Sequence, residues 1–412
     1  MTGEAAKVRT VVLVGTLDTK GHEYGYLRDR LVELGLQVIL VDAGVVGEPF
    51  VQPDISRAEV AAAAGADVAA LAAAGDRGAA VETMARGAAA VAVRLHAEGR
   101  LDAIGALGGS GGSAIATTAM RALPIGVPKL MVSTVASGDT SPYVGSVDVT
   151  MMYSVVDIAG VNQVSARIMS NAAGALAGMA RATVPDLGET RPLIVASMFG
   201  VTTPCVTVGR ERLEELGYEV LVFHQTGAGG GSLEELIKTG HIVGSFDATT
   251  TEFCDAVVGG VLAAVPDRLE SAGRAGIPQV VSLGALDMVN FGPEASVPER
   301  FRGRNLYVHN PTITLMRTTP DECREIAQLI ARKLNAATGP TELFVPLRGV
   351  SVIATEGQVF YDPEADAALF ETLRAEVDPA KVVLHELELD VNDPEFALAM
   401  ANRLHELIEA SS

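Results

Sequence analysis

The sequence predicts an α/β protein of two subdomains, each with a mainly parallel sheet. Short aliphatic runs, typical of strands buried on both faces, alternate with helical segments along the 412 residues. The composition fits this architecture, since 48% of the residues are hydrophobic, 4% are aromatic and 43 are glycine. The chain is too long for one ordinary domain, and a pattern from its first half recurs in its second. Two similar halves predict a ligand cleft between them.

The charge and the cysteines exclude several classes of protein. The formal net charge of −20 argues against binding nucleic acid or an anionic membrane surface. Cys205, Cys254 and Cys323 are scattered and predict neither a metal site nor a disulfide framework. Because the apolar stretches are short and interrupted, we expect no signal peptide and no membrane span. We therefore expect a cytoplasmic protein.

The first candidate site follows the first expected strand, at 11–14. A helix then runs to Gly35, and a second strand at 38–41 ends in an aspartate. Ligands of open α/β sheets bind at the carboxyl ends of strands. The expected contacts here are Gly15, Thr16, Asp18, Thr19, Lys20 and Asp42.

Three of these residues have two interpretations each. In the functional one, Lys20 contacts a phosphate, Asp18 accepts a hydrogen bond or binds Mg²⁺, and Asp42 binds a ribose. In the structural one, Lys20 is solvated, Asp18 caps the following helix and Asp42 starts a turn. A cap explains Asp18 alone, but not the whole Gly-Thr-x-Asp-Thr-Lys run.

The second candidate site is a glycine loop. An alanine-rich helical stretch at 57–99, with breaks expected at Gly65, Gly75 and Gly78, precedes a strand at 103–107. A helix resumes at 114, so backbone N–H groups at its N-terminus are open to an anion, most often a phosphate. The loop is neither a P-loop nor a G-x-G-x-x-G motif, and a tight structural turn is the alternative. Its residues are Gly108, Gly109, Ser110, Gly111, Gly112 and Ser113.

A third loop follows the strand expected at 127–132. Its hydroxyls and carboxylate would hold phosphate oxygens or a metal-bound water, or cap a helix. The candidate residues are Thr134, Ser137, Gly138, Asp139 and Thr140. After two apolar segments, a polar connector at 183–192 predicts the boundary between subdomains 1–184 and 191–412.

The second half repeats the pattern of the first. The run LVELGLQV at 31–38 has its counterpart in LEELGYEV at 213–220, and 126–133 resembles 276–283. We infer an internal duplication with a period far longer than that of a solenoid repeat. Late strands are expected at 344–347 and 382–387, with helices from about 362 and 394.

Three residues of the second half are candidate catalytic groups. His224 ends a strand before a second glycine loop, where Gly229, Gly230 and Gly231 would offer N–H groups to an anion. Asp247 ends another strand, so we expect it to converge with His224 as an acid/base pair. Asp287 follows a further strand and would face the cleft. A structural histidine is the alternative for His224, and a buried residue without catalytic function is the expectation for Cys205.

Four segments of the sequence together resemble one family. They are 15–21, 108–113, 137–140 and the run GALDMVNF at 284–291. The chain resembles the Tm-one-like ATP-binding family over nearly its whole length. The resemblance implies two Rossmann-like subdomains, a nucleotide site for ATP, and homodimers.

Two functions are therefore compared. The first is a nucleotide-binding protein whose glycine loops hold the phosphates of ATP, with Mg²⁺ as an accompanying ion. The second is an enzyme that acts on a small phosphorylated or carboxylated metabolite in the cleft, with His224, Asp247 or Asp287 as acid or base. A second glycine loop favours the enzyme. The missing Walker lysine argues against a fast P-loop ATPase.

Overall fold

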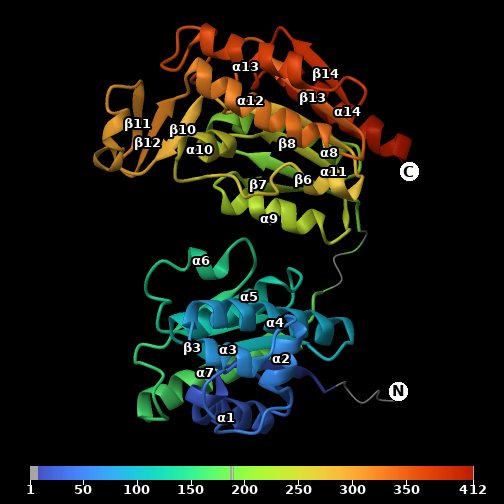
Figure 1. Cartoon of the computed structure of the whole chain (residues 1–412). Helices are drawn as coiled ribbons and strands as arrows, with labels where there is room; N and C mark the ends of the chain where they lie inside the picture. The colour runs from blue at the N-terminus through green and yellow to red at the C-terminus, as the bar shows by residue number, and fades with distance from the viewer. Residues whose placement is uncertain (1–7, 186–187, 189, 412) are drawn as a thin grey trace. The chain divides into compact units, whose positions relative to one another are not determined.

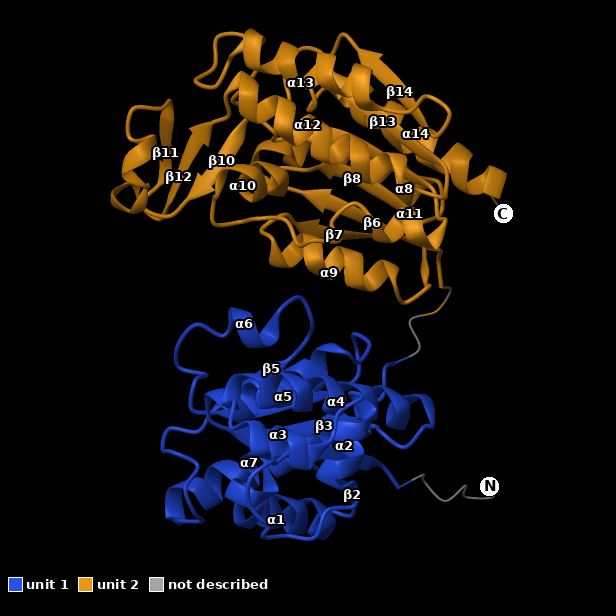
Figure 2. Cartoon of the chain, in the orientation of Figure 1, with its two compact units in different colours: residues 1–186 blue, residues 187–412 orange. Residues whose placement is uncertain are grey.

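The computed structural model describes residues 8–185, 188 and 190–411. The chain divides into two compact units, Met1–Asp186 and Leu187–Ser412 (Figure 2). This division falls inside the polar connector at 183–192, of which Asp186, Leu187 and Glu189 lie outside the described residues. Each unit is an α/β structure with a parallel sheet, as the sequence predicts.

Unit 1 is coloured blue to green in Figure 1. It has a five-stranded parallel sheet in the order β2-β1-β3-β4-β5. Its strands are β1 (Thr10–Gly15), β2 (Gln37–Asp42), β3 (Ala103–Gly108), β4 (Lys129–Ser133) and β5 (Thr150–Tyr153). The helices are α1 (Leu17–Glu33), α2 (Arg57–Ala63), α3 (Val68–Ala74), α4 (Arg77–Ala97), α5 (Ser110–Arg121), α6 (Ser141–Val144) and α7 (Gln163–Arg181). The apolar residues of α2, α4 and α5 pack on one face of the sheet, and those of α1 and α7 on the other. Burial of both faces explains the continuous aliphatic runs.

The glycine-containing segments of unit 1 are more helical than expected. Helix α1 begins at Leu17 rather than after Gly21, although Lys20 has the non-helical φ of −125°. Helix α5 begins at Ser110 rather than Ala114. The first-turn N–H groups of a helix have no intrahelical partner, so a glycine there leaves them open to a ligand. The alanine-rich stretch breaks at Gly65 and Gly75, whereas Gly78 lies inside α4.

Unit 2 has a six-stranded parallel sheet in the order β14-β13-β9-β8-β6-β7 and a three-stranded antiparallel sheet, β10-β12-β11. The antiparallel sheet is not predicted by the sequence. The strands are β6 (Leu193–Met198), β7 (Glu219–His224), β8 (Ile242–Thr249), β9 (Gln279–Gly284), β10 (Met288–Phe291), β11 (Leu306–Asn310), β12 (Ile313–Arg317), β13 (Thr341–Pro346) and β14 (Val382–Leu387). The α-helices are α8 (Thr203–Glu215), α9 (Ala228–Ile237), α10 (Glu252–Val258), α11 (Ser271–Ala275), α12 (Pro320–Asn335), α13 (Pro363–Glu376) and α14 (Pro394–Ser411). The 3₁₀ turns are η1 (Gly200–Thr202), η2 (Glu294–Ser296) and η3 (Glu299–Phe301).

The topologies of the two units agree with an internal duplication. The order β2-β1-β3-β4 in unit 1 corresponds to β7-β6-β8-β9 in unit 2. Leu31 lies in α1 between β1 and β2, and Leu213 lies in α8 between β6 and β7. Both leucine side chains are fully buried. The repeated LxELGxxV run therefore occupies equivalent positions in both sheets.

Across the described residues, every helix is too short or too polar to cross a lipid bilayer.

Candidate functional site

The sheet of unit 1 opens between β1 and β3. Strand β1 lies between β2 and β3, and the chain crosses from β1 to β2. The loops that follow β1 and β3 therefore run in different directions at the carboxyl ends of the strands. Pairing of the two strands ends at Leu13 and Gly105. Beyond that point the Tyr24 hydroxyl lies 2.6 Å from the Val14 carbonyl oxygen and 2.8 Å from that of Leu107. The tyrosine thus bridges the strands where they diverge.

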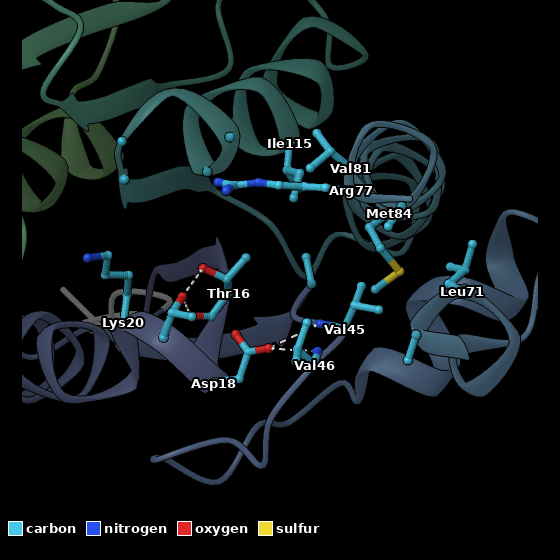
Figure 3. Close-up of a pocket in the computed structure, with 18 of the residues that line it drawn as sticks. Thr16, Asp18, Lys20, Val45, Val46, Leu71, Arg77, Val81, Met84 and Ile115 are labelled. Atoms are coloured by element: carbon cyan, nitrogen blue, oxygen red, sulfur yellow. Dashed lines mark hydrogen bonds between the residues drawn. The ribbon is translucent and has the colours of Figure 1, made fainter. Parts of the chain in front are cut away.

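A cavity of about 520 Å³ lies at this edge (Figure 3), within the size range of small-molecule sites. Its walls come from the carboxyl ends of β1, β2 and β3, from the start of α1 and from α3, α4 and α5. The polar lining residues include Thr16, Asp18, Thr19, Lys20, Asp76, Arg77 and Ser110, together with Gly108, Gly109, Gly111 and Gly112. The first two predicted loops therefore meet in one cavity.

Two helices begin at this cavity. Neither N-cap residue, Thr16 of α1 or Gly109 of α5, makes a side-chain cap hydrogen bond. At the start of α1 the Asp42 carboxylate already accepts from Leu17 N. At the start of α5 the first-turn N–H groups carry the positive end of the helix dipole and suit an anion. At Gly111, a Cβ atom would have only Arg77 Nη2 nearby, at 3.8 Å, so the glycine leaves open space above the first turn.

Asp18 has one occupied and one unoccupied carboxylate oxygen. Its side chain is 4% exposed, and its Oδ2 accepts hydrogen bonds from the backbone N–H groups of Val45, Val46 and Gly47 at 3.1–3.3 Å. Its Oδ1 is buried and has no hydrogen-bond partner among the described residues. Asp18 is not the N-cap of α1, so the capping interpretation is wrong. The residue anchors the loop after β2 and leaves one oxygen for a donor or a cation.

Lys20 lies at the same end of the cavity as Thr16 (Figure 3). Its ammonium group donates to the carbonyl oxygen of Ile158. The hydroxyls of Thr16 and Thr19 are 2.8 Å apart. Together with the start of α5, these groups form a polar end with a positive charge.

The other end of the cavity is apolar. Side chains from the loop after β2 and from α3, α4 and α5 line it (Figure 3). They include Val45, Leu71, Val81, Met84 and Ile115. An apolar wall beside a small number of polar groups is the usual composition of a cofactor site.

Two residues predicted to bind a nucleotide have internal partners instead. The Asp42 carboxylate accepts from Leu17 N, Gly44 N and the Arg57 guanidinium, and it is 1% exposed. The Ser113 hydroxyl lies 2.6 Å from that of Ser133 and is buried. Both residues therefore stabilise the sheet edge rather than face the cavity.

Gly15 and the third loop are also explained by local structure. At Gly15, a Cβ atom would lie 2.0 Å from the Tyr24 ring, so only glycine fits beneath the tyrosine. Residues 137–140 do not line the cavity. Asp139 accepts from the N–H and hydroxyl of Ser141 at the start of α6, and these hydrogen bonds lower its pKa. The hydroxyl oxygen of Thr134 lies 3.6 Å from where a Cβ atom on Gly109 would be.

In unit 2, His224 and Asp247 lie on opposite faces of the sheet. Ser197 pairs with Phe223, so His224, the next residue, points to the other face. The Ser197 hydroxyl donates to Asp247 Oδ1 at 2.5 Å, which places Asp247 on the face of Ser197. The prediction that His224 and Asp247 converge as acid and base is therefore wrong.

Asp247 belongs to a buried charge cluster, defined as Glu234, Asp247, Glu252 and Arg268. The Arg268 guanidinium donates to all three carboxylates. Burial raises the pKa of Glu252, and attraction to Arg268 opposes this shift. Burial alone would lower the pKa of Arg268, but the charge of Asp247 raises it. The cluster has the geometry of a structural core.

The second glycine loop lies close to its own neighbours. A Cβ atom at Gly229 would be 1.8 Å from the His224 carbonyl oxygen, and one at Gly230 would be 2.4 Å from Glu252 Oε1. The Gly227 N–H donates to the same Glu252 oxygen at 2.8 Å. Gly229, Gly230 and Gly231 lie in α9 rather than in a loop. Close packing accounts for these glycines, and an internal carboxylate already accepts at the start of α9.

Two further candidates of unit 2 are fully buried. Asp287 accepts from the Ser351 hydroxyl at 2.8 Å, and burial raises its pKa to about 6. Burial raises the pKa of the Cys205 thiol to about 12, as expected for a residue without catalytic function.

Two family models match the chain and together cover most of it. They are described as the N-terminal and C-terminal domains of an uncharacterised protein family, UPF0261, and match residues 9–185 and 191–408. The chain belongs to this family.

Relatives support this assignment. A UPF0261 protein of Clostridium tetani (strain Massachusetts / E88) is 54% identical over 401 residues, 97% of this chain and 99% of that protein. The ToMV resistance protein Tm-1(GCR237) of Solanum lycopersicum is 42% identical over 337 residues, 80% of this chain and 45% of that protein. This match confirms the resemblance indicated by the motifs. The UDP-N-acetylglucosamine 2-epimerase of Rickettsia bellii aligns with 98% of this UPF0261 chain and 96% of its own at a TM-score of 0.23 and 10% identity, so no functional argument rests on it.

Arg77 and the apolar wall of this UPF0261 chain lie outside the motifs found in the sequence. Arg77 is the first residue of α4, after the N-cap Asp76. A polar N-cap before an alanine-rich run was a signal for the start of this helix. No motif around Leu71 or Met84 indicates a binding surface, because α3 and α4 reach the cavity only through the tertiary fold.

Proposed function

We propose that unit 1 binds ATP in the cavity at the carboxyl ends of β1, β2 and β3. The observation that carries this proposal is the meeting of the uncapped N-terminus of α5 and the polar residues after β1 with an apolar wall in one cavity of about 520 Å³. An anionic group and an apolar ring system in one ligand match these two ends. The resemblance to the Tm-one-like ATP-binding family supports the same ligand.

In this proposal the ligand has a defined direction. The phosphates bind at the start of α5, beside Lys20 and the hydroxyls of Thr16 and Thr19, where N–H groups and a positive charge gather. The adenine ring packs against the apolar end, between Leu71 and Met84 of α3 and α4 and Ile115 of α5.

Asp18 fits the role of a ligand for Mg²⁺ that arrives with the nucleotide. Mg²⁺ is usually held by one or two carboxylates and the phosphates of the substrate. Asp18 lines the cavity, and its Oδ1 is buried without a partner among the described residues. Among the residues that the structure describes, no group of three or more His, Cys, Asp or Glu is arranged to hold a metal ion. The bound ion would neutralise phosphate charge beside the Asp18 carboxylate.

Titration calorimetry with Mg-ATP tests the proposal. In Gly111→Val, a β-branched side chain enters the open space above the first turn of α5 and blocks close approach of a phosphate. We expect the affinity for ATP to fall about tenfold or more, which corresponds to about 1.4 kcal/mol of binding free energy. Gly174→Val is the matched control, since Gly174 is an exposed helical glycine of α7 with no neighbour within 4 Å of its would-be Cβ. Unchanged affinity in a folded Gly111→Val variant would remove this loop from the site.

A further inference from the structure

Arg77 faces the start of α5 from the opposite wall of the cavity. It is the first residue of α4, and its guanidinium reaches toward the first turn of α5 (Figure 3). Its Nη2 lies 3.8 Å from where a Cβ of Gly111 would be. The guanidinium is thus adjacent to the uncapped N–H groups that a phosphate would occupy.

Arg77 has no internal partner, unlike the other arginines of α4. Arg86 pairs with Glu82 and Arg94 with Glu98. The structure gives Arg77 no hydrogen bond or ion pair with any residue that it describes. The nearest acidic side chain in sequence, Asp76, instead caps α4 by accepting from Ala79 N at 3.0 Å.

Arg77 is an exposed residue at a helix position that slightly disfavours a cation. A cation at the first position of a helix opposes the helix dipole, and here it also faces the positive end of α5. Lys20 adds another positive charge to the lining of the same cavity. Asp18 and Asp76 also line the cavity, so its carboxylates equal Lys20 and Arg77 in number, but Asp76 is engaged as the N-cap of α4. An oxyanion bound here would contact both the Arg77 guanidinium and the first-turn N–H groups of α5.

We propose that Arg77 binds the phosphate groups of the nucleotide, from the side of the cavity opposite the strand ends. This inference rests on the proposed function, since it names a residue that recognises the phosphates of that ligand. A guanidinium can donate two parallel hydrogen bonds to a phosphate, which a lysine ammonium cannot reproduce. Arg77 therefore distinguishes phosphorylated from unphosphorylated ligands.

The test compares Arg77→Ala and Arg77→Lys with the wild type in calorimetric titrations of adenosine, ADP, ATP and inorganic tripolyphosphate. We expect Arg77→Ala to lose about 10- to 100-fold in affinity for ATP and to keep its affinity for adenosine. Arg77→Lys should recover only part of the loss. Arg86→Ala is the control on the same helix, because Arg86 does not line the cavity. Circular dichroism and thermal unfolding verify that each variant is folded.

The outcomes separate this inference from the proposed function. If the wild type binds ATP and Arg77→Ala binds it equally well, the role of Arg77 is refuted and the nucleotide site stands. If the wild type binds tripolyphosphate through Arg77 but no adenine nucleotide, the anion site stands and the proposed function fails. If the wild type binds neither ATP nor tripolyphosphate, both are refuted.

Discussion

Arg268 and Asp247 form a two-pronged ion pair inside unit 2, with Nη1–Oδ2 and Nη2–Oδ1 distances of 2.6 Å each. The same guanidinium donates through Nε to Glu252 at 2.7 Å and contacts Glu234 at 3.3 Å. One cation thus serves three carboxylates, and all four side chains are 0–2% exposed. Both oxygens of Asp247 are used, so the residue cannot assist a distant histidine.

Removal of Arg268 should therefore destabilise unit 2 strongly. In Arg268→Met the three carboxylates would remain buried without a cation, which costs about 3–5 kcal/mol when one partner of a buried pair is lost. Urea unfolding followed by circular dichroism measures the change in free energy of unfolding. Arg274→Met is the control, since Arg274 pairs with Glu270 at the surface. A loss below about 1 kcal/mol would mean that the cluster is protonated or hydrated rather than held by Arg268.

The buried cluster also illustrates which features the sequence could predict. Aliphatic runs between small-residue loops identified the parallel strands of both sheets, because burial on both faces leaves a local pattern. The repeated LxELGxxV run identified the duplication. The face on which His224 lies depends on its register with Met198, which no local pattern encodes. Arg268 stands outside every motif and reaches Asp247 only in the folded unit.

The candidate site was predictable to a similar extent. The loops at 15–21 and 108–113 were found because glycine and small polar residues at strand ends have a local signature. Asp42 has the same signature, yet its carboxylate holds Leu17 N, Gly44 N and Arg57. Whether a strand-end acid faces a ligand or its own backbone depends on contacts distant in sequence. For the same reason, Arg77 could be found only once α4 was placed beside α5.

A second prediction concerns pH. Burial raises the pKa of Asp287 to about 6, with the nearby Arg317 opposing this shift and Asp366 adding to it. The folded state therefore binds a proton more tightly than the unfolded state, whose aspartate titrates near 3.9. The contribution of Asp287 to stability is largest below about pH 4 and is lost as the pH rises to about 6. The loss corresponds to about 3 kcal/mol for a difference of this size.

Urea unfolding of the wild type and Asp287→Asn between pH 4 and pH 7 measures this contribution. The amide does not titrate. As the pH rises, the free energy of unfolding of the wild type should therefore fall relative to that of Asp287→Asn. A difference that is constant across this range would contradict a raised pKa at Asp287.

The last prediction concerns the two roles open to Asp18, hydrogen-bond acceptor or Mg²⁺ ligand. In Asp18→Asn the side-chain oxygen can still accept from Val45, Val46 and Gly47, so the loop after β2 should keep its place. The amide lacks the negative charge that Mg²⁺ prefers in a ligand. If Asp18 holds the ion, wild-type affinity for ATP falls on removal of Mg²⁺ with EDTA, whereas the variant shows little dependence on the ion.

We expect Asp18→Asn to lower the affinity for ATP about tenfold or more in the presence of Mg²⁺. The physical reason is charge balance, because a carboxylate beside phosphates repels them unless a cation lies between. Calorimetry with and without EDTA measures it, and thermal unfolding verifies the fold of the variant. An equal loss of ATP affinity with and without Mg²⁺ would instead assign Asp18 Oδ1 to a hydrogen bond from the nucleotide, such as one from a ribose hydroxyl. An unchanged dependence on Mg²⁺ in the variant would place the ion elsewhere in the cavity.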